Sequence, residues 1–212
     1  MTQKEILTLI ERKEYSKVKI ILSEMNPVDI ADILHELDKT SLSIIFRLLK
    51  KDEAADVFAY LDTDTQRDLI DFLTDKEIGH IINDLFLDDA VDFIEEMPAN
   101  VVMRVLKNAN EETRTQINQF LQYSKDSAGS IMTNEYVDLR DNLTVAEAFD
   151  IIRQKAYDKE TIYTCYVKDA SRKLIGIVTI KQLLLANKNA LISSIMETNI
   201  ICAKTSDDKE EL

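Results

Sequence analysis

Residues 26–34, Asn-Pro-Val-Asp-Ile-Ala-Asp-Ile-Leu, carry the pattern that decides the fold of this chain. Asn followed by Pro is typical of a helix start, because Pro has no amide hydrogen to satisfy in the first turn. Ile30, Ile33 and Leu34 stand at i, i+3 and i+4, which places them on one helix face. The stretch therefore predicts an amphipathic helix.

The pattern recurs every 24 residues through the first half of the chain. One apolar column is Leu9, Ile33, Val57, Ile81 and Val105, and a second, from the other half of each repeat, is Ile21, Ile45, Leu69, Phe93 and Ile117. A third column, Leu7, Ala31, Ala55, Gly79 and Met103, is mostly small, as close helix packing requires. Residues 1–123 are therefore predicted to form five stacked helix pairs, with the apolar stripes as their core.

The second half changes to short β-rich runs between helical ones. Residues 136–139, 162–167 and 174–178 are predicted strands, and 144–152 and 180–186 are predicted helices, the first capped by Asn142 or Thr144. The order is β, α, β, β, α, so the fold class is α+β.

A longer repeat marks a second module. Ser130-Ile131-Met132 returns 64 residues later as Ser194-Ile195-Met196, and each copy precedes a strand-like pair, Tyr136-Val137 and Ile200-Ile201. Residues 124–193 are then one module and 194–212 the start of another, in which Thr205 to Leu212 would begin a helix. A half-built module would leave its apolar face uncovered, so the chain is expected to be a piece of a longer protein.

The chain is acidic, and its excess negative charge is concentrated in one stretch. The chain has 26 basic and 39 acidic residues, a formal net charge of −13, which argues against nucleic-acid binding. Residues 52–96 alone hold fifteen acidic and two basic residues. With two cysteines, no leader pattern and no long apolar run, a reducing cytosolic setting is expected.

The helical repeats, followed by Asp126-Ser127-Ala128-Gly129-Ser130-Ile131-Met132-Thr133 and by Glu160-Thr161-Ile162-Tyr163, resemble the cytosolic part of MgtE-type magnesium transporters. The resemblance implies an N domain (1–123), a first CBS module (124–193) and the start of a truncated second (194–212). It also implies a homodimer formed through CBS modules, a transmembrane pore in the same full-length chain, and a location at the cytoplasmic face of the membrane. In that family, Mg²⁺ between acidic N-domain and CBS surfaces holds the pore shut.

By that resemblance, the metal-facing carboxylates are Asp56, Asp88 and Asp92 in the N domain, with Asp208 and Glu210 on the CBS side. Mg²⁺ keeps several waters and takes one or two carboxylates, which suits an acidic surface. Asp88 or Asp89 has a plainer interpretation as the N-cap of the following helix. Most of the other acidic residues fit a solvated face. His35 and His80 lack metal-ligand spacing and fit surface or helix-packing positions, and Cys165 fits a buried thiol.

The resemblance also assigns a nucleotide site to Gly176 and Thr179. Gln182 stands where the family has an Asp for the ribose, and an amide lacks the charged acceptor that holds a diol, which argues against ATP binding.

The sequence has no catalytic motif, so an enzyme is not expected. The two functional hypotheses are a Mg²⁺-sensing regulatory region and a soluble helical-repeat adaptor with a nucleotide-responsive CBS module.

Overall fold

The computed structural model describes residues 3–212, except for the side chains of Asp52 and Asp158. It contains two compact units, Met1–Gln122 and Tyr123–Leu212, and each has a buried core of its own. Among residues 3–212, no helix combines the length and the hydropathy needed to span a bilayer.

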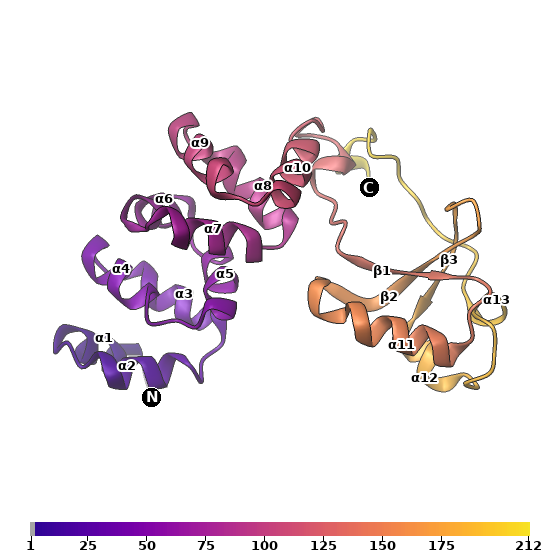
Figure 1. The fold of residues 1–212 in the computed structure, drawn as a ribbon, viewed down its shortest axis with the longest axis horizontal. Helices are drawn as coiled ribbons and strands as arrows, with labels where there is room; N and C mark the ends of the chain where they lie inside the picture. The colour runs from indigo at the N-terminus through magenta and orange to yellow at the C-terminus, as the bar shows by residue number, and fades with distance from the viewer. Residues whose placement is uncertain (1–2) are drawn as a thin grey trace. The chain divides into compact units, whose positions relative to one another are not determined.

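Residues 3–120 form ten helices in five successive pairs (Figure 1). They are α1 (Gln3–Glu11), α2 (Tyr15–Leu22), α3 (Pro27–His35), α4 (Lys39–Phe46), α5 (Lys51–Ala59), α6 (Thr63–Phe72), α7 (Asp75–Asp84), α8 (Leu87–Glu96), α9 (Ala99–Asn108) and α10 (Glu111–Phe120). Helix α3 packs on α5, α5 on α7 and α7 on α9, while α4 packs on α6 and α8 on α10. This stack of helix pairs confirms the helical-repeat prediction.

The predicted apolar columns form the core of the helical unit. Ile33, Val57 and Val105 are at most 1% exposed, and the second column is buried from its second member onward, at Ile45, Leu69, Phe93 and Ile117. The small-residue column follows the packing of the odd-numbered helices through Ala31, Ala55 and Gly79. Met103 departs from it and is exposed, because it lies in the last helix pair of this unit and no further pair covers it.

Hydrogen-bonded caps set the starts of several helices. The Asn26 side chain accepts a hydrogen bond from the Asp29 amide, and Thr74 forms a capping box with Glu77. In the second unit, the helix predicted to start at Asn142 or Thr144 is capped by Thr144. Local side-chain chemistry therefore fixes these boundaries.

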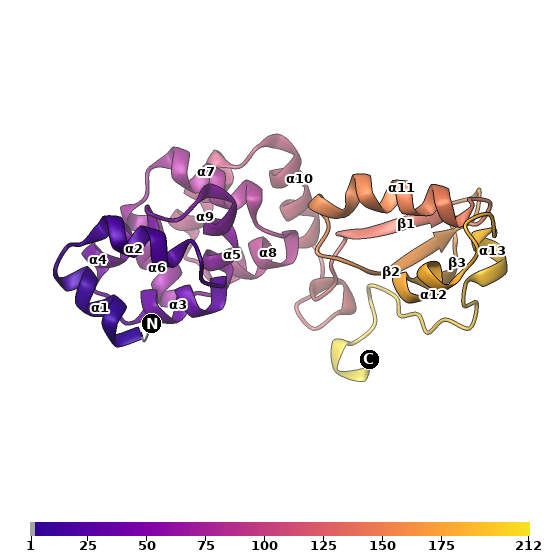
Figure 2. The same ribbon diagram turned by 90° about the horizontal axis from the view of Figure 1, so that it is seen from below.

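The second unit is a three-stranded sheet with helices over one face (Figures 1 and 2). Its regular elements are β1 (Tyr136–Arg140), α11 (Val145–Lys155), β2 (Thr161–Lys168), β3 (Leu174–Thr179), α12 (Ile180–Leu185) and α13 (Ile192–Ile195), with short 3₁₀ turns at η1 (Ala128–Ser130), η2 (Ala156–Asp158) and η3 (Lys209–Glu211). β2 lies in the middle, parallel to β1 and antiparallel to β3. The predicted βαββα order is confirmed.

The core of this unit lies between the sheet and its helices. Val137 and Leu139 of β1, and Cys165 and Val167 of β2, are buried with Ala148 of α11. Residues that alternate with these along the strands, such as Asp138 and Tyr166, are only partly buried. One face of the sheet is therefore apolar and covered, and the other is partly exposed and mixed in character, with Asp138 on the same face as apolar residues such as Ile177.

Two predictions for the last residues were wrong. Ile200 and Ile201 form no strand, because within the described residues no strand lies beside them to pair with. Residues 205–212 form a turn and the 3₁₀ helix η3 instead of an α-helix start.

The Ser-Ala-Gly-Ser motif holds the C-terminal segment. The Ala128 amide donates to the Asp207 carbonyl at 2.7 Å, and the Gly129 amide donates to the Thr205 carbonyl at 3.0 Å. A Cβ on Gly129 would lie 2.5 Å from the Tyr123 ring, so only glycine fits. The motif therefore has a structural role, and the start of a second module at residues 194–212 stays a prediction.

Candidate metal site

Asp88 and Asp92 lie on helix α8. The N-cap of α8 is Phe86, whose backbone is extended, so Asp88 and Asp89 occupy the first helical turn and the N-cap interpretation was wrong. A carboxylate in the first turn is stabilised by the positive end of the helix dipole. Asp92 follows Asp88 by four residues, which places both on one face of the helix. Asp92 is exposed, and Asp88 is partly buried.

One oxygen of Asp88 is unusual. Its Oδ1 atom is buried and has no hydrogen-bond partner among the described residues. A buried acceptor without a partner costs about 1–3 kcal/mol, so such atoms require a physical explanation. A cation or an ordered water at this oxygen would remove the cost.

Asp56 lies on α5, which packs against α8. The contact between the two helices includes Phe58 and Phe93, whose ring centroids are 5.1 Å apart in an edge-to-face arrangement. Asp56 is exposed. The described residues contain no group of three acidic, histidine or cysteine side chains arranged to hold a metal. The packing of α5 on α8 thus brings two acidic helices together without building a closed metal cage.

Three acidic residues of the surrounding stretch form ion pairs with basic residues about 30 positions away. Lys39 pairs with Asp68 at 2.6 Å, Arg47 with Glu77 at 2.8 Å, and Arg104 with Asp75 at 3.0 Å. The charge count of residues 52–96 did not show these pairs, because the basic partners Lys39, Arg47 and Arg104 lie outside that window. Several acidic residues predicted to be merely solvated therefore link neighbouring helix pairs.

The pKa of the Glu77 carboxyl group is strongly lowered. Its hydrogen bond with Arg47 lowers its pKa to about 2, and bonds from Thr74 act in the same direction against the opposing effect of burial. The guanidinium of Arg47 also donates to the Phe72 carbonyl at 2.8 Å. The carboxylate of Glu77 therefore has a structural role.

Asp208 and Glu210 lie in the second unit, around η3. Asp208 Oδ1 accepts a hydrogen bond from the Glu210 amide at 2.9 Å, and both residues are exposed. The Lys209 amide donates to the Asp126 carbonyl at 2.9 Å, which ties the turn to the motif region. Asp208 therefore has a local capping role that the sequence analysis did not anticipate.

Gly176 and Thr179 take different positions with respect to a ligand. Gly176 is buried, and a Cβ there would lie 2.8 Å from the Glu197 carbonyl, so the chain itself covers this residue. Thr179 borders a largely apolar groove of about 600 Å³ that also includes Tyr163 and Lys181. Gln182 Oε1 already accepts from both the amide and the hydroxyl of Thr179, at 2.7 and 2.9 Å. The acceptor that a ribose diol would need is thus engaged in the helix cap.

Both units match known protein families. Residues 25–126 match the family described as MgtE intracellular N domain, and residues 128–189 match the CBS domain. A magnesium transporter MgtE of Thermus thermophilus is 33% identical over 130 residues, which are 59% of this chain and 29% of that protein. One of Enterococcus faecalis is 33% identical over 101 residues, 48% of this chain and 22% of that protein. The chain thus spans less than a third of these relatives, and neither is named as an enzyme.

Solved structures extend the similarity to both units together. The cytosolic domain of the Mg²⁺ channel MgtE in complex with ATP matches with a TM-score of 0.91 and 28% identity, over 99% of this chain and 86% of that one. The soluble part of a magnesium transporter matches with a TM-score of 0.90 and 23% identity, over 99% and 82%, which shows a shared fold. The chain therefore carries an MgtE-type intracellular N domain followed by a CBS domain.

Proposed function

We propose that this chain is a Mg²⁺-sensing regulatory region of a magnesium transporter or channel, located at the cytoplasmic face of the membrane. In this proposal it acts on a transmembrane pore carried by the same full-length protein and assembles as a homodimer through its CBS modules. The names of its relatives and the match to an MgtE cytosolic domain support this function over a soluble adaptor.

The observation that carries the proposal is the buried Oδ1 of Asp88, which has no hydrogen-bond partner among the residues that the structure describes. It lies one helical turn from Asp92, on a helix that packs against the helix of Asp56. A bound Mg²⁺ would neutralise these carboxylates while keeping most of its waters, so it needs no closed cage. Without Mg²⁺, repulsion between these carboxylates and a second acidic surface favours separation of the two surfaces.

Asp208 and Glu210 are the proposed acidic partners in the second unit. The carboxylate of Glu210 has no role in the η3 cap, since its backbone amide alone bonds to Asp208. If several weakly bound ions prefer the closed form, each tenfold difference in affinity favours closing by about 1.4 kcal/mol.

A Mg²⁺ titration at constant ionic strength tests the proposal. Millimolar MgCl₂ should raise the melting temperature and reduce the radius of gyration, whereas KCl of equal ionic strength should not. Asp88→Asn with Asp92→Asn should lose most of the Mg²⁺ response.

The matched control is Asp64→Asn with Asp71→Asn, which removes the same charge from exposed positions of α6. An equal loss of response in this control would mean that the Mg²⁺ response depends only on the total charge of the unit. No Mg²⁺ response in the unaltered chain would reject ion sensing.

We infer further that ATP binds weakly, because Gln182 is engaged in the Thr179 cap. Calorimetric titration with ATP should show little heat, and Gln182→Asp should strengthen binding by restoring a charged acceptor. Tight binding of ATP to the unaltered chain would contradict this inference.

A further inference from the structure

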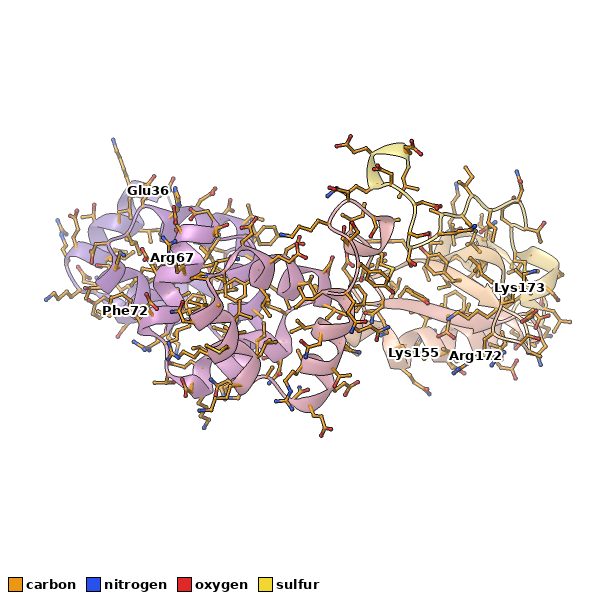
Figure 3. The ribbon with its side chains drawn as sticks, turned by 90° about the horizontal axis from the view of Figure 1, so that it is seen from above. Glu36, Arg67, Phe72, Lys155, Arg172 and Lys173 are labelled. Carbon is orange, nitrogen blue, oxygen red and sulfur yellow. The ribbon has the colours of Figure 1, made fainter. Side chains whose placement is uncertain are left out.

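A polar pocket of about 370 Å³ lies in the second unit at the edge strand β1. Its wall includes Lys155 at the end of α11, Lys159 just after η2, and Lys168 at the end of β2. Figure 3 shows Lys155 at the end of its helix. Three ammonium groups from three elements therefore border one pocket.

Asp138 organises two of these lysines. Its carboxylate is 3.1 Å from Lys155 Nζ and 3.7 Å from Lys168 Nζ. Burial alone would raise the pKa of Asp138, but the hydrogen bond from Lys155 and the charges of both lysines lower it. Asp138 is therefore ionised at neutral pH and holds both ammonium groups at the pocket.

Tyr136 fixes the position of Lys168. The ammonium lies 5.1 Å from the Tyr136 ring centroid and 3.3 Å from its hydroxyl oxygen, and the ring contacts Tyr166 edge-to-face at 4.9 Å. The Lys168 side chain is only 25% exposed. A half-buried ammonium held on an aromatic ring is better organised for ligand binding than a mobile surface lysine.

The charges of the pocket do not cancel. Asp138 is the only carboxylate in its wall, against three lysines, and Lys159 forms no ion pair within the described part of the chain. The pocket thus carries about two excess positive charges in a protein whose formal net charge is −13. A local positive site in a negative field favours a compact, multiply charged anion over a diffuse acidic surface, which the rest of the protein would repel.

We propose that this pocket binds a phosphate dianion, either free or as the terminal group of a small phosphorylated molecule. Its donor set fits that chemistry, because the amides of Asn134 and Gln154 border it together with the three ammonium groups. Lysines bind phosphate as point charges, and the volume suits a small molecule. The proposal does not depend on Mg²⁺ sensing.

Titration of the full chain with inorganic phosphate and pyrophosphate, followed by two-dimensional NMR, tests this site. Saturable shifts are expected around Asp138 and Lys168, with binding that strengthens from pH 6 to 7.5 as phosphate becomes dianionic. Lys155→Gln with Lys159→Gln should weaken binding at least tenfold. Unchanged affinity in that variant, or no binding at millimolar concentrations, would overturn the proposal.

The matched control is Lys173→Gln with Lys188→Gln, which removes two exposed charges of the same unit from outside the pocket. It should change affinity less than twofold, and an equal loss in both variants would reduce the site to non-specific charge attraction. AMP, tested with Gln182→Ala, distinguishes binding in this pocket from binding in the Thr179 groove. If AMP and phosphate binding both depend on Gln182 and neither on Lys155 and Lys159, the ligand belongs in the Thr179 groove and the proposal is wrong.

Discussion

The ion pair between Arg47 and Glu77 shows how single side chains join repeats of the helical array. Its members lie 30 positions apart, and Arg47 also donates to the carbonyl of Phe72, the last residue of α6. One guanidinium therefore connects α4 to both α6 and α7. Partly exposed ion pairs usually contribute little, but bonds to two separate elements make this one stronger than average.

Glu77→Gln should reveal the pH dependence of this pair. The folded-state pKa of Glu77 is lowered to about 2 from 4.5, so its stabilisation is fully present above about pH 4.5 and is lost as the pH falls toward 2. The variant keeps the capping geometry and should lower the free energy of unfolding by about 1 kcal/mol at pH 7, after allowance for solvent screening. Urea denaturation should show the same difference at pH 7 and pH 5 and a smaller one at pH 3.5.

Asp64→Asn is the control for that measurement. Asp64 pairs with Arg67 in the same helix and its side chain is 81% exposed, so the change should cost less than about 0.5 kcal/mol. If Glu77→Gln were equally mild at pH 7, the contact between Arg47 and Glu77 would not stabilise the folded state.

The two cysteines should differ sharply in reactivity. Cys165 is buried in the core of the second unit, and burial raises its pKa to about 11, whereas Cys202 is exposed. Because the thiolate is the reactive form, a disulfide reagent at pH 8 should label one thiol quickly and leave Cys165 intact until the unit unfolds. Cys202→Ser should abolish the fast phase. A remaining fast phase in that variant would mean that the core around Cys165 opens readily.

At the level of elements, the sequence predicted those features that depend on local pattern. The 24-residue apolar columns predicted the helix pairs, and the capping boxes of Thr74 and Thr144 depend on residues three positions away. The strand at Ile200 failed because a strand needs a partner, which its own sequence does not specify. The N-cap of α8 failed because Phe86, a poor capping residue, begins that helix.

The candidate site was predictable only in part, for a similar reason. A count of acidic residues along the chain located the charged helices, and the family resemblance singled out Asp88. It could not show that Asp88 Oδ1 lies buried without a partner, nor that Arg104 reaches back to Asp75 and to the carbonyl ends of α6. The apolar periodicity of one sequence does not reveal which side chains of different repeats contact each other.

Gly79→Ala tests how tightly these elements pack. Helix propensity alone would favour alanine by about 1 kcal/mol. A Cβ at this position, however, would lie 2.8 Å from the Asn108 carbonyl oxygen at the end of α9, and a backbone atom cannot move aside cheaply. The substitution should therefore lower the free energy of unfolding by about 1–3 kcal/mol in urea denaturation.

The reference for that substitution is Lys76→Ala, which introduces the same residue on the exposed surface of helix α7, where Lys is already a good helix former. It should be neutral within about 0.5 kcal/mol. A stabilised Gly79→Ala variant would show that α7 and α9 have room to separate.

The charge of the whole molecule divides into three parts with different roles. Part of the acidic stretch joins repeats through pairs such as Asp68 with Lys39, and part lies on α8 around Asp88. The second unit adds a cationic pocket at Lys155 and Lys168. A single net charge therefore conceals sites with opposite preferences for ions.

Separating the two units tests whether Mg²⁺ links them. Residues 1–122 bury their own core, so this piece should fold alone, with a helical circular dichroism spectrum and one cooperative thermal transition. If Mg²⁺ bridges carboxylates of both units, the piece retains only part of each ion site. Its melting temperature should then rise less with millimolar MgCl₂ than that of the helical unit in the full chain, at equal ionic strength. An equal rise in both would place Mg²⁺ entirely within the helical unit, since the free energy that a ligand adds depends only on its affinity for the folded form.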